Sequence, residues 1–376
     1  MLNVKMGASN SLDPVVAVKE LFDAIDQPQS SFVLFYCTSE YDLDALGAEL
    51  NRSFGNANLI GCTSAGEISS AGYNKGTLIG LSVASEDFTV VTERMDNLSD
   101  FQLTDGEVTT SKLTKQLKAL GKAPVSEHTF GFLLIDGLSS QEEVVVDALH
   151  RNLNNIQLFG GSAADGDRFE KTYIYHDGAF RSNSAIFSLI HTTHPFTIFK
   201  TEHFDRDEEE IVVTEADISS RVVSEINGLP AAHEYARVMG VDNVGELTAT
   251  MFATHPVAVS IGGENFVRSI MKVNEDETIS FACAIDEGIV LSVAKANDLI
   301  ENLENAMEDL RNKIGTPQLV LGCDCLFRML EMEQKSIKDE VGRILSENNV
   351  FAFSTYGEQY NGMHVNQTFT GVAIGA

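Results

Sequence analysis

The sequence predicts a mixed α/β fold in which duplicated strand-helix-strand units form layered sheets with helices on the outer faces, divided into two domains. Residues 59–67 recur 291 positions later as 350–358, and the same offset carries Thr77–Leu81 onto Thr368–Val372. A middle copy of the first segment lies at 158–166, displaced by 99. Each copy has the same order of apolar and amphipathic stretches. Repeats of this length indicate duplication on the scale of domains, because solenoid repeats are much shorter.

Each unit is expected to contain a strand, a helix, a second strand and a closing strand. The predicted elements are 31–37, 41–54, a strand from 59, and 77–84 in the first unit; 129–135, 141–153, 157–159 and 185–190 in the second; and 318–323, 330–345, 350–353 and 369–374 in the third. Because the strands are near-continuous apolar runs, we expect both of their faces to be buried. The second unit also carries what we interpret as an inserted hairpin, 172–175 with 179–181.

Between the second and third units the sequence changes character. This segment is predicted to form short strands around a helix that begins after Pro230 and ends at Gly240. An amphipathic helix is predicted to follow over 297–314. We place the domain boundary near residue 215. The predicted domains are therefore 1–214, with two units, and 215–376, a ligand-binding domain with the third.

Composition narrows the classes of function. The formal net charge of -29 repels phosphate backbones and anionic lipids, so we expect neither a nucleic-acid nor a membrane partner. The start of the chain does not resemble a secretory signal, and no apolar run is long enough to span a bilayer, so we expect a cytoplasmic protein. The sequence contains no P-loop, no G-x-S-x-G elbow and no H-E-x-x-H motif, and we predict no catalytic residue and no enzyme activity.

Two glutamates follow predicted strands directly. Glu67 after Gly66, and Glu358 after Gly357, would be presented at the end of a sheet, where α/β folds often bind ligands. The alternative is a structural turn in which each carboxylate caps local backbone amides. Both glutamates are candidate ligand-binding residues.

The third unit also contains Cys323 and Cys325, separated by one residue. Cys323 is a candidate ligand-binding residue or nucleophile, although a structural pair of buried thiols is the simpler interpretation. The five cysteines show no C-x-x-C spacing, which argues against disulfides and a zinc site. Gly160 and Gly161 are interpreted as a tight structural turn rather than an anion site.

A polar pocket is predicted in the second domain from Arg268, Arg328, Glu358 and Asn366. The two arginines lie beside strand segments of an acidic chain and could pair with a ligand carboxylate through forked hydrogen bonds. The alternative is that Arg328 simply neutralises Glu358.

Three histidines are candidates for ligand or metal binding. His203 lies close to the predicted domain join, beside Phe204, which could stack on a planar ligand, and His191 and His194 are three residues apart. Each could equally be an ordinary polar residue of the surface or the core.

With these residues in view, the chain resembles the FIST family of bacterial sensory proteins over essentially its whole length. The resemblance rests on LIGCTSAGEI at 59–68, LFGGSAADG at 158–166, the segment 201–203, HPVAVSIGGENFVRSI at 255–270, GCDCLFR at 322–328, and FSTYGEQY and NQTFTGVAIG in 353–375. It implies a non-enzymatic ligand-binding sensor that acts in trans on a histidine kinase or a cyclic-di-GMP enzyme.

The stand-alone members that this chain resembles look like haem-binding nitric oxide sensors. That resemblance implies haem as cofactor, and we expect His203 to ligate the iron, with His191 or His194 next. The chain has no haem-attachment signature, so this expectation rests on the resemblance alone. The alternatives are a haem-free sensor of a small polar metabolite such as an amino acid, and an enzyme that uses Cys323 or Glu358.

Overall fold

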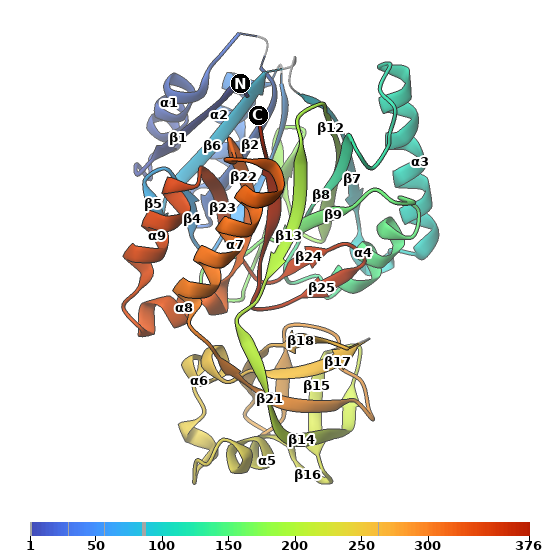
Figure 1. The fold of residues 1–376 in the computed structure, drawn as a ribbon, viewed down its shortest axis with the longest axis vertical. Coiled ribbons are helices and arrows are strands. Elements are labelled where there is room, and N and C mark those ends of the chain that lie inside the picture. Colours follow the sequence, from blue (N-terminus) through green and yellow to red (C-terminus); the bar gives the residue numbers. More distant parts are fainter. Residues whose placement is uncertain (1, 29, 56, 85–87, 262) are drawn as a thin grey trace.

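The computed structural model describes residues 2–28, 30–55, 57–84, 88–261 and 263–376, which form two bodies (Figure 1). The three-unit body holds the chain up to residue 203 and again from residue 297. The inserted body holds residues 204–296 and lies below the first in Figure 1. The chain crosses between the bodies twice, from β13 to β14 and from β21 to α7.

Three six-stranded sheets with one shared strand order build the three-unit body. In each sheet, an edge strand pairs with the closing strand of the unit, and the closing strand pairs with the first of the two parallel strands. The second parallel strand pairs with a hairpin that completes the sheet. The first sheet is β1 (Val4–Ser9), β6 (Leu78–Ala84), β2 (Ser30–Thr38), β3 (Asn58–Ser64), β10 (Ile174–His176) and β11 (Ala179–Arg181). The second is β7 (Phe88–Asp96), β12 (Ser184–Thr192), β8 (Thr129–Ile135), β9 (Leu158–Ser162), β24 (Glu358–Tyr360) and β25 (Met363–Val365). The third is β13 (Phe196–Thr201), β26 (Phe369–Ile374), β22 (Leu319–Cys325), β23 (Val350–Thr355), β4 (Glu67–Ser69) and β5 (Gly72–Asn74).

Each unit gives its hairpin to the sheet of another unit. The first unit gives β4 and β5 to the third sheet, the third gives β24 and β25 to the second, and the second gives β10 and β11 to the first. The register is equivalent in all three, with Glu67 opposite Phe353, Glu358 opposite Gly161, and Ile174 opposite Cys62. The hairpin predicted from 172–175 and 179–181 is present as β10 and β11, but its interpretation as an insertion was wrong, because it is the regular counterpart of the other two. This exchange makes the three units interdependent.

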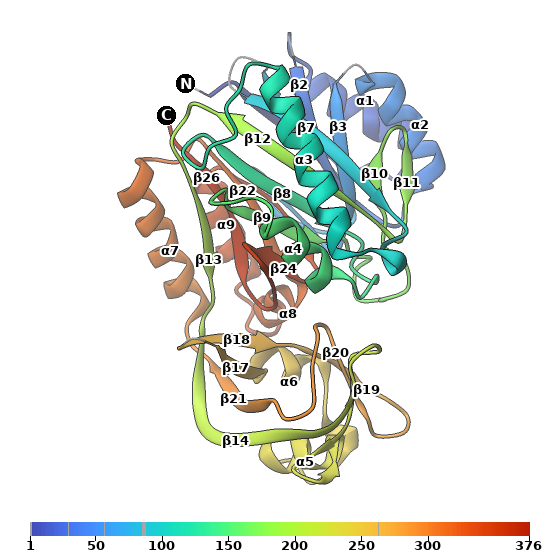
Figure 2. The same cartoon turned by 90° about the vertical axis from the view of Figure 1, so that its right-hand side faces the viewer.

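Helices cover the outer face of each sheet. They are α1 (Pro14–Ile25) and α2 (Leu43–Phe54) on the first sheet, α3 (Leu103–Ala119) and α4 (Glu142–His150) on the second, and α7 (Leu299–Ile314), α8 (Leu326–Gln334) and α9 (Lys338–Glu347) around the third (Figures 1 and 2). The local sequence explains where α1, α2 and α7 begin, because the N-cap residues Asp13, Asp42 and Asp298 accept hydrogen bonds from the first backbone amides of these helices. Helices α1 and α3 have no counterpart among the predicted elements.

The three sheets share one apolar core. Alternate residues of a strand point to opposite faces, so Phe32, Leu34 and Tyr36 of β2 join the central core, while the residues between them pack under α1 and α2. Strands of all three units reach this centre, where the ring of Tyr36 stacks on that of Phe353 at 4.2 Å. The prediction of strands buried on both faces is confirmed.

The inserted body is an eight-stranded antiparallel sheet with two helices. Its strands are, in order, β18 (Glu264–Arg268), β17 (Val257–Ile261), β21 (Val290–Ala296), β14 (Phe204–Asp217), β15 (Val222–Ile226), β20 (Ile279–Phe281) and β19 (Ile270–Val273), with β16 (Leu229–Pro230) paired to β15. The helices are α5 (Ala231–Val238) and α6 (Ala249–Thr254), and short 3-10 turns occur at Leu98–Asp100 and Val244–Glu246.

In space, this layout differs from the predicted division into 1–214 and 215–376. The third unit lies with the other two, because β23 pairs with β4 of the first unit and β24 pairs with β9 of the second. Among the described residues, every helix is too short or too polar to cross a lipid bilayer.

Candidate functional site

Three cavities lie beyond the carboxyl ends of the parallel strands, each beside a turn that enters an exchanged hairpin. The first cavity, of about 230 Å³, lies between α8 and the turn before β4. The second, of about 200 Å³, lies between the segment after β8 and the turn before β24. The third, of about 410 Å³, lies between the segment after β2 and the loop before β10. The carboxyl ends of parallel strands are the usual ligand-binding edge of α/β folds. Each of the three cavities is therefore a candidate ligand-binding site.

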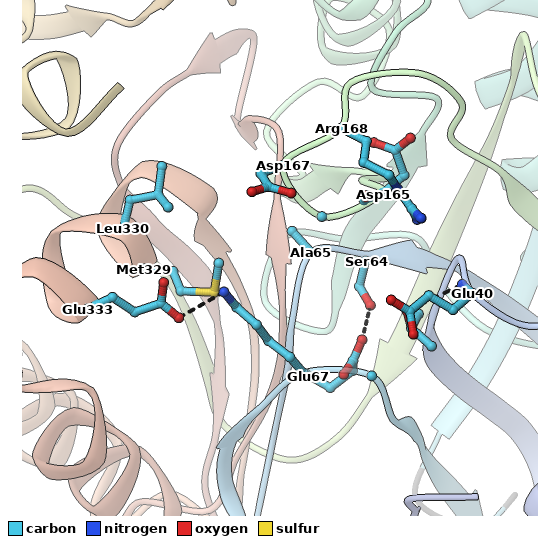
Figure 3. A pocket seen from close by; sticks show the side chains of 14 residues that line it. Glu40, Ser64, Ala65, Glu67, Asp165, Asp167, Arg168, Met329, Leu330 and Glu333 are labelled. Atoms are coloured by element: carbon cyan, nitrogen blue, oxygen red, sulfur yellow. Dashed lines mark hydrogen bonds and ion pairs between the residues drawn. The ribbon is translucent and has the colours of Figure 1, made fainter. Parts of the chain in front are cut away.

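The first cavity is the only one of these three that all three units line. Ser64, Ala65 and Glu67 come from the first unit, Asp165–Arg168 from the second, and Glu333 of α8 from the third (Figure 3). A ligand bound here would touch all three units at once.

The lining of the first cavity is strongly acidic. Its carboxylates belong to Glu40, Glu67, Asp165, Asp167 and Glu333, against two basic side chains. One of these, Lys75, already forms an ion pair with Glu333 at 2.8 Å. The guanidinium of Arg168 donates to the backbone oxygen of Asp165 at 3.0 Å and to the Ser39 hydroxyl. The unmatched negative charge favours a ligand that carries a cationic group.

Glu67 is held rigidly in the wall of this cavity. Its carboxylate accepts hydrogen bonds from the Ser64 hydroxyl, and from the backbone amide and hydroxyl of Thr77 at 3.1 and 2.7 Å. Burial raises the pKa of Glu67 to about 6, and these hydrogen bonds limit the rise. Glu67 therefore changes charge near pH 6.

Glu358 repeats this arrangement in the third unit. It accepts from the Thr355 hydroxyl, and from the amide and hydroxyl of Thr368 at 3.2 and 2.8 Å. Burial, again opposed by these bonds, raises the pKa of Glu358 to about 8. Glu358 lines none of the cavities described here, and its bonds match the structural alternative of a carboxylate that caps a local amide. In the second unit the counterpart position is Ile174, and Asp136 at the end of β8 supplies a buried carboxylate instead.

Arg328 belongs to a buried ionic network and does not bond to Glu358. Its guanidinium donates to Asp324 at 2.7 Å and to Nδ1 of His203 at 3.1 Å, while Nε2 of His203 lies 2.7 Å from Glu331. Lys335 completes the network with a bond of 2.7 Å to Glu331. The alternative in which Arg328 neutralises Glu358 was wrong, because the first turn of α8 directs Arg328 back onto the strand residue four positions earlier.

This network lies at the crossing between the bodies. His203 occupies the short link from β13 to β14, and its backbone oxygen accepts from the amide of Asn297, where the chain returns, at 2.7 Å. Arg328 and Glu331 on α8 hold the His203 side chain, while Glu333 of the same helix lines the first cavity. Helix α8 thus connects the first cavity to the crossing.

The three histidines predicted as haem ligands lie in different surroundings. His203 is 2% exposed and both of its ring nitrogens are bonded, and burial lowers its pKa. His191 is 8% exposed, with its ring 5.9 Å from that of His128. His194 is half-buried in the turn before β13. None of the three lines a cavity described here, so haem binding stays a prediction without geometric support.

The remaining predicted site residues do not form one pocket. Arg268 is half-buried in a separate cavity of about 400 Å³ beside β25. Asn366 is 1% exposed and accepts from the backbone amide of Ser269. Cys323 is buried in the central core, and burial raises the pKa of its thiol well above the ordinary value, which disfavours a nucleophilic thiolate.

The two glycines interpreted as a turn, Gly160 and Gly161, lie inside β9. A methyl group at Gly160 would lie 2.2 Å from the backbone oxygen of Leu133, and one at Gly161 would meet Phe353 at 2.8 Å. These glycines permit close approach of neighbouring strands, so the turn prediction was wrong.

Sequence reasoning missed most of the cavity residues, among them Glu40, Lys75, Asp165 and Arg168. They follow strand ends in three different segments and share no motif. Their common signal is position, because each lies a few residues beyond a strand of a repeated unit.

Comparison with known families matches residues 31–229 to the FIST N domain and residues 231–361 to the FIST C domain. The chain belongs to the FIST family. FIST domains are sensory domains of signal transduction. The FIST N match begins at β2, covers the rest of the first two units and runs into the inserted body. The FIST C match covers the rest of the inserted body and most of the third unit.

Two individual proteins are similar to this FIST protein. An uncharacterised protein of Methanocaldococcus jannaschii is 23% identical over 358 residues, covering 84% of this chain and 67% of its own length. The crystal structure of a cyanuric acid hydrolase from A. caulinodans aligns with this chain over 100% of both chains, with a TM-score of 0.39 and 8% identity. A similarity this low says nothing about activity.

Proposed function

We propose that this FIST protein is a non-enzymatic sensor of a small polar molecule with an amine, amidine or guanidine group, and that the ligand binds in the first cavity. The observation that carries the proposal is the excess of carboxylates in a cavity that all three units line. Desolvated charge pairs and charge-assisted hydrogen bonds are strong enough to select for a cation. An amino acid or polyamine has suitable chemistry.

The signal would follow from the position of the cavity. A ligand that pairs with Glu333 competes with Lys75 and changes the contacts of α8, which also holds His203 at the crossing between the bodies. A shift of α8 therefore has a direct route to the arrangement of the inserted body. The receiver that we propose is a histidine kinase or a cyclic-di-GMP enzyme that recognises this arrangement.

Thermal unfolding with a panel of amines, guanidines, carboxylates and neutral sugars tests the ligand class. A ligand present at about 100 times its Kd stabilises the folded protein by about 2.7 kcal/mol, so a cationic compound should raise the Tm by a few degrees. Stabilisation by carboxylates alone, or by no cation in the panel, would refute the proposed ligand class.

Variants locate the site. Glu40→Gln removes one carboxylate from the cavity, and we expect it to weaken binding of the identified cation about tenfold. Glu301→Gln in the first turn of α7, outside the cavity lining, is the matched control. If both variants bind like the wild type, the ligand binds elsewhere. The receiver is tested separately, by measuring the activity of a partner kinase or cyclase with ligand-free and ligand-loaded protein.

A further inference from the structure

The second cavity differs from the first because the inserted body forms one of its walls. From the three-unit body it is lined by Gly137, Leu138 and Ser140 after β8, by Phe169, by Leu326 and Phe327 at the start of α8, and by Tyr356. From the inserted body it is lined by Ser220 and Arg221, by Met271 and Lys272 of β19, and by the segment 280–282. Anything bound here contacts both bodies.

Aromatic and apolar side chains make up most of its walls. The rings of Phe169 and Tyr356 stack on each other, with their centroids 4.4 Å apart and an angle of 21° between their planes. The Tyr356 hydroxyl donates to Asp165 and accepts from the Phe169 backbone amide at 3.1 Å, which fixes the ring in place. Phe281 and Phe327, both nearly buried, line the same space. The cavity therefore surrounds a planar apolar group with fixed aromatic and apolar side chains.

The charged side chains of this cavity are basic only. Among the described residues, no Asp or Glu lines it, although the chain as a whole has a formal net charge of -29. The guanidinium of Arg221 is already neutralised, since it pairs with Glu142 at 2.7 Å and with Glu143. Lys272 is exposed, and its ammonium has no ion pair among the described residues. Lys272 is thus available to an anionic group at the cavity.

We propose that the second cavity binds a small aromatic carboxylate, with its ring against Phe169 and Tyr356 and its carboxylate on Lys272. The volume of about 200 Å³ is below the range of roughly 300–1,000 Å³ typical of drug-sized ligands, which favours a ligand of one or two rings. The proposal for this site does not rest on the proposed cation in the first cavity, because the two linings share no residue.

Occupation of the second cavity would fix the arrangement of the two bodies. The ligand would lie between α8 and β19, which belong to different bodies. The two cavities are also connected, because Tyr356 of the second is bonded to Asp165 of the first. Binding at one site should therefore change the affinity of the other.

The absence of tryptophan from the chain gives a direct assay. Indole-3-acetate, excited at about 295 nm where tyrosine absorbs little, reports its own binding without a protein background, and the neutral indole-3-acetamide tests the contribution of the charge. We expect the acid to bind saturably and more tightly than the amide.

Variants assign the site. Lys272→Gln should weaken binding of indole-3-acetate about five- to tenfold, as expected for loss of one charge-assisted contact, and should leave indole-3-acetamide unchanged. Lys313→Gln, in the last turn of α7 and outside the cavity, is the control and should behave like the wild type. Phe169→Leu keeps an apolar side chain but removes the ring, and should weaken both compounds.

The proposal is refuted if neither compound binds at millimolar concentration. It is also refuted if Lys272→Gln and Lys313→Gln change the affinity for the acid equally, which would mean general electrostatic attraction. Equal loss of acid and amide on Lys272→Gln would show a disturbed fold rather than a carboxylate contact, and would overturn the assigned role of Lys272. None of these tests needs a ligand in the first cavity.

Discussion

Replacement of Glu358 by Gln should remove a large pH dependence of stability. The carboxyl group is fully buried, and its pKa rises from an ordinary value of 4.5 to about 8 in the folded protein. Between these values the folded protein keeps a proton that the unfolded chain has lost. The free energy of unfolding of the wild type should therefore fall as pH rises, by about 1.4 kcal/mol per pH unit and about 5 kcal/mol over the whole window.

Gln keeps the size of the side chain and an oxygen to accept from the Thr368 amide, while its amide group can donate to Thr355. We expect Glu358→Gln to match the wild type below about pH 5 and to lose much less stability by pH 8. The measurement is urea denaturation followed by circular dichroism at several pH values between 5 and 8.5.

Glu67→Gln is the matched control for this experiment. The pKa of Glu67 is about 6, so its contribution changes below about pH 6 and covers only about 2 kcal/mol. From pH 6 to 8 the Glu67→Gln variant should keep the slope of the wild type. If Glu358→Gln and the wild type lose stability in parallel over this range, Glu358 is already ionised in the folded protein and the reasoning fails.

Other predictions follow from the buried ionic network, the strand contacts and the histidines. Arg328→Met should lower the free energy of unfolding by about 3–5 kcal/mol because it leaves Asp324 buried and unpaired; the double variant with Asp324→Asn should recover most of that loss in chemical denaturation, and no recovery would contradict the pairing. Gly160→Ala should lower the free energy of unfolding by roughly 1–3 kcal/mol in the same denaturation assay, since its methyl group would meet the Leu133 oxygen at 2.2 Å. An unchanged free energy of unfolding would show that β8 and β9 can separate. Added hemin should give no Soret band that depends on His203, because both ring nitrogens are bonded; a band that is lost on His203→Leu, in a variant that still folds, would restore the haem prediction.

The sequence alone was sufficient to predict the repeated units and their strands. Near-continuous apolar runs such as 129–135 identify strands buried on both faces, and the constant offset between Glu67 and Glu358 identifies equivalent turns. The structure confirms the equivalence, since both carboxylates accept from a Thr or Ser hydroxyl three residues earlier and from a Thr ten residues later. These features are local, so they are visible in sequence spacing.

The exchange of hairpins was decided by tertiary structure. A three-residue strand such as β10 carries no local signal for its partner, and its pairing with β3 depends on how the units pack around the central core. For the same reason the third unit could not be assigned to the first body from the sequence. Strand pairing over such distances depends on packing, which is not encoded in any single window of residues.

The cavities were also decided by tertiary structure. Lys75, Arg168 and Glu333 lie in three different units and meet only because the turns between the exchanged strands converge. Conversely, Arg328 and His203 look like ligand-binding residues in the sequence but satisfy each other inside the protein. A sequence shows which side chains can carry charge. Whether that charge faces a cavity or a buried partner depends on the neighbours that the fold provides, because desolvation and pairing are properties of the packed structure.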